Sequence, residues 1–429
     1  MAGAFSPLIT RLKRDDDSQL LRGVTVALPP GLLGRLAGVS YCPPAAIATA
    51  AAKSGTEERA NPSCPAASRV GSVDAGAGAG PSPVHVQGQV YLAGPYKGAP
   101  LSLAIVTPAV AGPFDLGTVV VRATLQVDPE TAQVTVRSDP LPTILQGIPL
   151  DLRSITVAAD RAHFTLNPTN CEPKSVGGEA VSAAGLTASL SDRFQVGGCR
   201  GLDFGPRFQT RLFGGTKRSQ NPRLRAVLRP RPGEANIART VVTLPHSEFL
   251  DQSHIRTVCT RVQFAADQCP AGSVYGFARA FTPLLDQPLE GPVYLRSSSN
   301  KLPDLVVALR GQVNLNLVGR IDSANGGIRT TFERVPDAPV SKFVLTMRGG
   351  KRGLLVNSRD ICRRHSFSRV GFEGQNGKAS HIKPRLKNDC GKRARRRGGR
   401  KKNWLTAPVL IGHTCPASNA RFGTPPSRM

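Results

Sequence analysis

Short stretches of alternating hydrophobic and polar residues recur along the chain. In residues 119–127, Val121, Ala123 and Leu125 alternate with polar neighbours such as Arg122. Residues 153–157, 312–319 and 342–347 follow the same period of two. Alternation of this kind places one face of a strand against a core and the other in water, as in antiparallel sheets. The pattern therefore predicts a fold built from many short antiparallel strands.

Turn-forming residues support this interpretation. The chain of 429 residues contains 44 Gly and 36 Pro, which favours short strands joined by turns over long helices. Short helices are expected only at residues 45–54 and 247–258. We therefore predict an all-β fold class, with sandwich-like units of antiparallel strands and a few short helices.

The sequence contains two divergent copies of one unit. VTVALPPGLLGRLAGVSYC at residues 24–42 aligns with TVVTLPHSEFLDQSHIRTVC at residues 240–259, and GQVYL at residues 88–92 aligns with GPVYL at residues 291–295. CPAASRVGSV from Cys64 aligns with CPAGSVYGFA from Cys269. The anchors keep one order, which predicts a tandem repeat. We expect one repeat at residues 1–201, a second at 202–390, and a disordered basic tail at 391–429.

Each copy carries four cysteines in the same order, and only Cys415 is left over. An even, repeated set in a loop-rich chain predicts disulfides and an oxidising compartment. The simplest pairing joins neighbours within each copy. Zinc ligation is disfavoured because no CxxC pair occurs, and free buried thiols are the other alternative. The predicted disulfide residues are Cys42, Cys64, Cys171, Cys199, Cys259, Cys269, Cys362 and Cys390.

The beginning of the chain conflicts with that compartment, because no signal peptide is visible. The second copy opens with PRFQTRLFG at residues 206–214, an alternating segment for which the first copy has no counterpart. We therefore expect Met1 to lie inside a repeat of a longer precursor. That precursor would carry the matching strand and an export signal.

Charge is concentrated in the second half of the chain. The formal net charge is +27, and residues 201–429 hold 40 of the 56 Lys and Arg. A dense block at residues 383–402 predicts solvated chain that binds polyanions. The expected partners are anionic cell-wall polymer or lipid headgroups, with nucleic acid bound non-specifically as an alternative, and a purely solubilising tail remains open. The predicted polyanion-binding residues are Lys383, Arg385, Lys387, Lys392, Arg393, Arg395, Arg396, Arg397, Arg400, Lys401 and Lys402.

Catalytic motifs are absent from the sequence: it has no GxSxG and no HExxH. We expect no enzymatic activity, no cofactor and no metal site. No apolar stretch reaches the roughly 18 residues needed to cross a bilayer, so no transmembrane segment is expected. Oligomeric state is not readable from the sequence.

Several long motifs resemble a known group of proteins. LPPGLLGRLAGV, VYLAGPYKGAPLSLAIVTPAVAGPFDLGTVVVRA and FTLNPTNCEP are similar to motifs of uncharacterised exported repeat proteins of high-GC actinobacteria. The resemblance implies a secreted or cell-surface location and brings no activity. We therefore expect a non-enzymatic, extracytoplasmic structural or adhesive protein with a basic tether. A nucleic-acid-binding protein acting through residues 383–402 is the alternative, and a carbohydrate-binding module is a weaker one.

Overall fold

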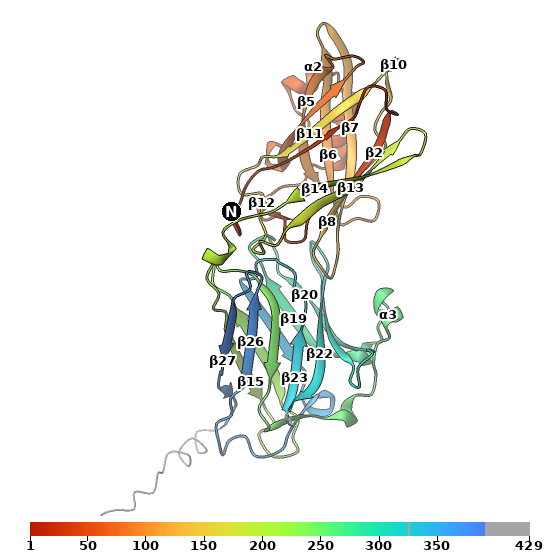
Figure 1. Cartoon of the computed structure of the whole chain (residues 1–429). Coiled ribbons are helices and arrows are strands. Elements are labelled where there is room, and N and C mark those ends of the chain that lie inside the picture. The colour runs from red at the N-terminus through yellow and green to blue at the C-terminus, as the bar shows by residue number, and fades with distance from the viewer. Residues whose placement is uncertain (325–326, 391–429) are drawn as a thin grey trace, which may run out of the picture.

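A computed structural model describes residues 1–324 and 327–390 of the chain. It contains two lobes that lie end to end (Figure 1). Each lobe is built on one large sheet, with ten strands in the N-terminal lobe and twelve in the C-terminal lobe. The predicted all-β class is therefore confirmed for the part of the chain that the structure describes. The tail predicted at 391–429 lies outside the described residues.

The N-terminal sheet is antiparallel throughout and has the order β1-β11-β4-β5-β6-β7-β8-β2-β13-β14. Its strands are β1 (Leu8–Lys13), β2 (Leu21–Ala27), β4 (Arg69–Ala77), β5 (Val84–Ala93), β6 (Leu101–Ala111), β7 (Phe114–Val127), β8 (Val134–Ser138), β11 (Leu152–Ala159), β13 (Lys174–Ser182) and β14 (Thr187–Phe194). Two small pairs accompany the large sheet: β3 (Leu33–Gly34) with β12 (Thr165–Leu166), and β9 (Ile144–Leu145) with β10 (Ile148–Pro149).

The C-terminal sheet has the order β27-β26-β17-β23-β22-β21-β20-β19-β24-β16-β15-β28. Its strands are β15 (Arg207–Phe213), β16 (Arg223–Arg229), β17 (Ile237–Thr243), β19 (Val274–Phe281), β20 (Leu289–Arg296), β21 (Asp304–Leu309), β22 (Leu315–Ala324), β23 (Gly327–Phe332), β24 (Lys342–Met347), β26 (Arg369–Gly374), β27 (Ala379–Ile382) and β28 (Leu386–Lys387). A small pair, β18 (Glu248–Leu250) with β25 (Leu355–Asn357), lies beside it. The β15–β28 pair is parallel.

The repeat seen in the sequence recurs in the topology. Read from β16 to β27, ten strands of the C-terminal sheet follow the same order as β1 to β14 in the N-terminal sheet. Strand β15 lies in the segment of the second copy for which the first copy has no counterpart in the sequence. It pairs with β16, whereas β1, the equivalent of β16, pairs with β11 alone among the described strands.

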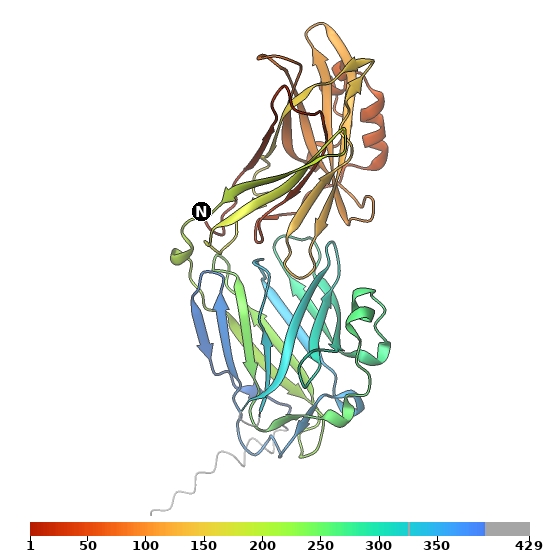
Figure 2. The same ribbon diagram turned by 45° about the vertical axis from the view of Figure 1, so that its right-hand side comes forward.

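The strands of each lobe belong to one continuous curled sheet, not to the two facing sheets that a sandwich-like repeat predicts. Each sheet bends into a half-barrel (Figures 1 and 2). The hydrophobic pattern did not distinguish these architectures, because alternation assigns a face to the interior without stating which element lies opposite.

The helices cover the outside of the half-barrels. In the N-terminal lobe, α1 (Pro44–Ala52) and α2 (Gly55–Ala60) lie against the outer side of the sheet (Figure 2). In the C-terminal lobe, α3 (Arg261–Ala265) is the corresponding helix. The helix predicted at residues 45–54 is observed as α1. The helix predicted at 247–258 is wrong: β18 and a 3-10 turn at Gln252–His254 occupy that segment, because its residues pair with β25.

Four disulfides join neighbouring cysteines within each copy, which is the simplest pairing. The bonds are Cys42–Cys64, Cys171–Cys199, Cys259–Cys269 and Cys362–Cys390. They indicate an oxidising, extracytoplasmic environment. Of the helices in the described residues, none is long and apolar enough to cross a membrane.

Candidate functional site

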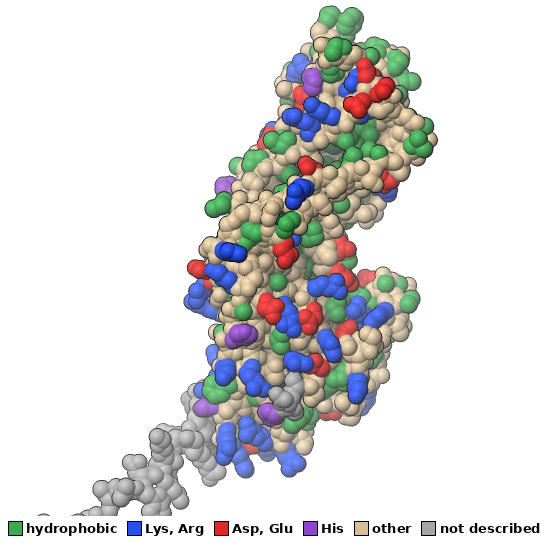
Figure 3. Space-filling view, viewed as in Figure 1, with side chains coloured by type: hydrophobic (Ala, Val, Ile, Leu, Met, Phe, Trp, Pro, Cys, Tyr) green, Lys and Arg blue, Asp and Glu red, His purple; other side chains and the backbone are tan. Residues whose placement is uncertain are grey.

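A large apolar cavity occupies the concave side of both half-barrels. Its volume is about 1650 Å³, and its walls come from strands of both lobes and from the junction between them. Such a volume exceeds the roughly 300–1,000 Å³ of ordinary small-molecule pockets. Hydrophobic side chains gather in a hollow on the face of the N-terminal lobe that Figure 3 shows. The cavity is the main candidate site of the molecule.

The exposure of the wall residues shows that the space is open. Leu103 and Ile105 on β6, and Ile155 and Val157 on β11, line the cavity, yet all four are only partly buried. Inward-facing aliphatic side chains of a packed core have almost no exposed surface. These side chains therefore border a space that no other part of the described chain fills.

The opposite face of β6 provides an internal contrast. Ala104 and Val106 point away from the cavity and pack with Ile47 and Ala50 of α1, and each of these residues is at most 7% exposed. Both faces of β6 are thus apolar for different reasons. The outer face forms a closed core with the helix, and the inner face forms the cavity wall.

The junction between the lobes continues the wall without interruption. The backbone N–H groups of Leu36 and Ala37 both donate to the carbonyl oxygen of Leu284, at 2.8 and 3.0 Å. Leu33, Leu166 and Leu284 form one buried hydrophobic cluster across the junction. Because these residues also line the cavity, the two half-barrels share one apolar interior.

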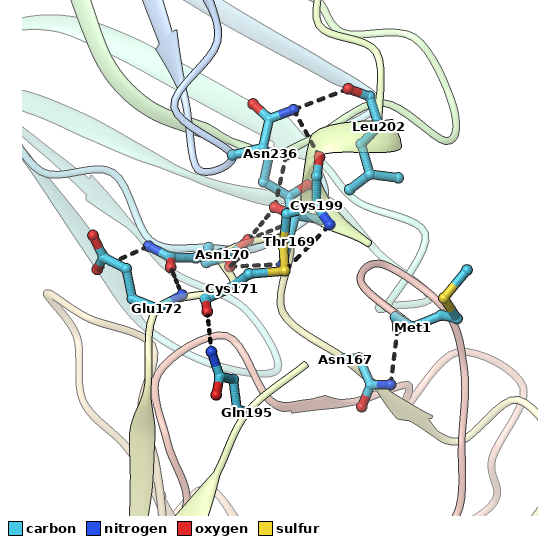
Figure 4. Close-up of a disulfide and its surroundings, with 12 residues drawn as sticks. Met1, Asn167, Thr169, Asn170, Cys171, Glu172, Gln195, Cys199, Leu202 and Asn236 are labelled. Carbon is cyan, nitrogen blue, oxygen red and sulfur yellow. Dashed lines mark hydrogen bonds between the residues drawn. A yellow bond between two sulfur atoms is a disulfide. The ribbon is translucent and has the colours of Figure 1, made fainter. Parts of the chain in front are cut away.

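A buried carboxylate fixes the lobes to each other. Asp337 of the C-terminal lobe is 7% exposed, and its carboxylate accepts hydrogen bonds from Thr169 N and Thr169 Oγ1 at 2.8 and 2.7 Å. It also accepts bonds from Asn170 N at 3.1 Å and from Asn236 Nδ2 at 2.8 Å. Thr169 and Asn170 directly precede the disulfide-bonded Cys171 (Figure 4). The disulfide therefore anchors the segment that holds the junction.

Few charged side chains reach the cavity, and most of them are exposed or paired. Asp151 pairs with Arg14, and Arg231 pairs with Glu234 at 3.5 Å. Arg35, which follows β3 at the junction, differs from them. Arg35 is one of the wall residues and is partly buried, its Nε is buried, and its side chain forms neither a salt bridge nor a hydrogen bond with any described residue.

A second buried acid lies outside the cavity wall. Glu248 on β18 is fully buried, and burial raises its pKa to about 7, while a hydrogen bond from Ser247 and the charge of Arg359 act in the opposite direction. Its Oε1 atom has no hydrogen-bond partner among the described residues, and neither has Oδ1 of Asn357, its register partner on β25. Glu248 is therefore a pH-sensitive position of the C-terminal lobe.

The residues predicted to bind polyanions are not part of the cavity. Lys383, Arg385 and Lys387 are exposed and lie on or next to the edge strands β27 and β28. The other eight, Lys392, Arg393, Arg395, Arg396, Arg397, Arg400, Lys401 and Lys402, lie outside the described residues.

A carbohydrate-binding module would need exposed aromatic side chains on one sheet face, and the tyrosines of the described residues are mostly buried. Tyr91 and Tyr275 are each 3% exposed, and Tyr96 and Tyr294 are partly buried. Tyr41 is 37% exposed. The described tyrosines therefore form no exposed row, and Trp404 lies outside the described residues. Within residues 1–324 and 327–390, no three His, Cys, Asp or Glu side chains are grouped to hold a metal ion.

Comparison with protein-family models finds no match, and comparison with curated proteins also finds none.

Proposed function

We propose that this protein is a non-catalytic, extracytoplasmic binding protein that shields an apolar, lipid-like ligand in the cavity shared by its two lobes. The apolar walls and volume of that cavity carry the proposal. The four disulfides support a location outside the cytoplasm, secreted or at the cell surface.

The energetics of empty space support an occupant. Cavities created in protein cores cost about 24 cal/mol per Å³, so a dry, empty space of this volume would cost on the order of 40 kcal/mol. A folded domain is stable by only about 5–15 kcal/mol. The cavity must therefore contain water or ligand, and its apolar walls offer water few hydrogen-bond partners.

The dimensions of the cavity suit an acyl chain. The wall includes residues of β7 from Leu116 to Val127, a distance of about 36 Å along the strand at 3.3 Å per residue. One leaflet of a bilayer core is about 15 Å thick, half of the roughly 30 Å core. A lipid chain therefore fits lengthwise within one lobe.

A series of linear alcohols tests the proposal. Each methylene transferred from water to an apolar site contributes about 0.8 kcal/mol, which is about fourfold in affinity. We expect the dissociation constant of the oxidised protein, measured by displacement of the neutral dye diphenylhexatriene, to fall about fourfold per methylene from octanol to dodecanol. An affinity that does not depend on chain length would reject the cavity as a ligand site.

The basic surface supports a second candidate function, electrostatic attachment to a polyanion. Residues 201–390 hold 30 Lys and Arg against 14 Asp and Glu, and the dense block begins at the exposed Lys383. Attachment of this kind is compatible with ligand binding, because the basic positions at the end of the described chain are not part of the cavity wall. The structural or adhesive role expected from the sequence would operate through this surface.

A further inference from the structure

We propose that Arg35 is an anion anchor inside the cavity, and that the ligand is an amphiphile with a carboxylate or phosphate group at one end of a hydrocarbon chain. This inference builds on the proposed function and specifies its ligand class. The observation that carries it is a guanidinium in an apolar wall with no acidic partner among the described residues.

The backbone around Arg35 is fixed on both sides. Arg35 N donates to the carbonyl oxygen of Phe164 at 2.7 Å, and the following residue, Leu36, is hydrogen-bonded to Leu284 of the other lobe. Residues 33–34 immediately before it form strand β3, which pairs with β12. The side chain therefore starts from a rigid position at the junction, where both halves of the cavity meet.

An unpaired arginine is costly in this environment. The guanidinium carries five N–H donors, and Nε of Arg35 is buried without a hydrogen-bond partner among the described residues. Leaving this buried donor unpaired is unfavourable, whereas a bidentate carboxylate or phosphate accepts from Nε and from one Nη group and compensates the charge. The other cationic residues of the wall, Arg11, Arg193 and Arg231, are exposed and can be solvated.

The position also determines how such a ligand would lie. An anionic group at the junction leaves the apolar space of either lobe for the hydrocarbon chain. Leu33 and Leu36 flank Arg35 and are 8% and 6% exposed, so the chain of the ligand would begin next to buried aliphatic side chains. An anion without a hydrocarbon chain would gain the charge contact alone.

The test compares ligands of one chain length in the oxidised full-length protein. We expect dodecanoate and dodecyl phosphate to displace diphenylhexatriene at concentrations at least about tenfold lower than dodecanol, because hydrogen bonds to charged groups are worth about this ratio. The relative affinities of the two anions distinguish a carboxylate ligand from a phosphate ligand. Acetate and inorganic phosphate should not displace the dye.

Variants at Arg35 test whether this residue causes the preference for anionic ligands. In Arg35→Gln, the ratio of the displacing concentration of dodecanol to that of the better anion should fall to about one. Arg35→Lys should keep part of this ratio. Arg137→Gln, an exposed arginine of β8 outside the wall, should keep the whole ratio. Thermal unfolding verifies that each variant is folded, and Arg35→Met replaces Arg35→Gln if the latter does not fold.

The outcomes separate this inference from the proposed function. If dodecanol binds but both anions bind no better, or if Arg35→Gln keeps the ratio, the anchor is refuted while the cavity stands. If none of the three long-chain ligands binds, both proposals fail.

Discussion

Filling the cavity should stabilise the protein, whereas filling a packed core should not. Val157 lies on β11, points into the cavity and is partly buried. Replacing it with tryptophan buries about 100 Å² more apolar surface, which at about 25 cal/mol per Å² stabilises the fold by about 2.5 kcal/mol. The indole also occupies space that a ligand needs. We therefore expect Val157→Trp to raise the free energy of unfolding and to weaken dodecanol binding.

Val106 provides the matched control. It lies on β6 of the same sheet but faces α1, is 2% exposed and does not line the cavity. Inserting a large side chain into such a closed core typically costs 1–3 kcal/mol. The two tryptophan variants should therefore change stability in opposite directions.

Urea unfolding of the oxidised proteins, with tryptophan fluorescence and circular dichroism as independent probes, measures both changes. Stripping bound lipid beforehand matters, because a ligand that binds only the folded state adds to the apparent stability. If Val157→Trp destabilises the protein as much as Val106→Trp does, the space next to β11 is already filled by the protein and cannot hold a ligand.

Three further predictions address other parts of the molecule. Glu248→Gln should raise the free energy of unfolding by up to about 3 kcal/mol at pH 8 and make it less dependent on pH. Folding raises the pKa of this carboxyl from 4.5 to about 7, so its contribution to stability is complete below pH 4.5 and is lost as the pH rises to about 7. Urea unfolding at pH 4, 6 and 8 measures the difference. Asp337→Ala should lower the free energy of unfolding by at least about 3 kcal/mol, because it leaves Thr169, Asn170 and Asn236 without their hydrogen-bond acceptor. Calorimetry of this variant should show the two lobes melting separately. An unchanged single transition would contradict the role of Asp337 at the junction. Truncation after Cys390 should abolish most polyanion binding and leave both lobes folded. Binding by the full chain should weaken on the order of a thousandfold between 50 and 200 mM salt if it involves about six phosphate contacts. Sedimentation with anionic vesicles or DNA measures both effects, and binding that survives truncation would place the site on the lobes.

Local features of the fold were predictable from the sequence. Period-two alternation identified strands such as β7, and the repeated anchors identified two units with the same strand order. The disulfide pattern was readable because four cysteines recur in register. These signals are local or repetitive, and each occurs within a short stretch of sequence.

The cavity and its junction were not predictable in this way. The inward residues of β6 and β11 have the composition of an ordinary core, and only the curl of the sheet leaves space between them. The contact of Asp337 with Thr169 spans 168 residues, and an aspartate in a Pro-rich loop gives no local sign of a buried role. Arg35 follows a glycine in an apolar segment. The pattern of that segment indicates a repeat anchor and gives no sign that the arginine lies in a cavity wall.

The two copies differ at the position of Arg35. Aligning Leu28-Pro29 with Leu244-Pro245 places Arg35 opposite Asp251. Asp251 does not line the cavity, and its carboxylate accepts hydrogen bonds from Asn221 at 2.8 Å and Ser253 at 2.6 Å. The same fold position thus holds a satisfied acid in one lobe and an unpaired cation in the other.

None of the eight disulfide-bonded cysteines lines the cavity. Duplication of the unit has left an arginine in the cavity wall of one copy, where the other copy has an aspartate outside the wall. An amphiphile of the proposed class would need an apolar and a cationic environment in one continuous space, and the junction at Leu284 connects them.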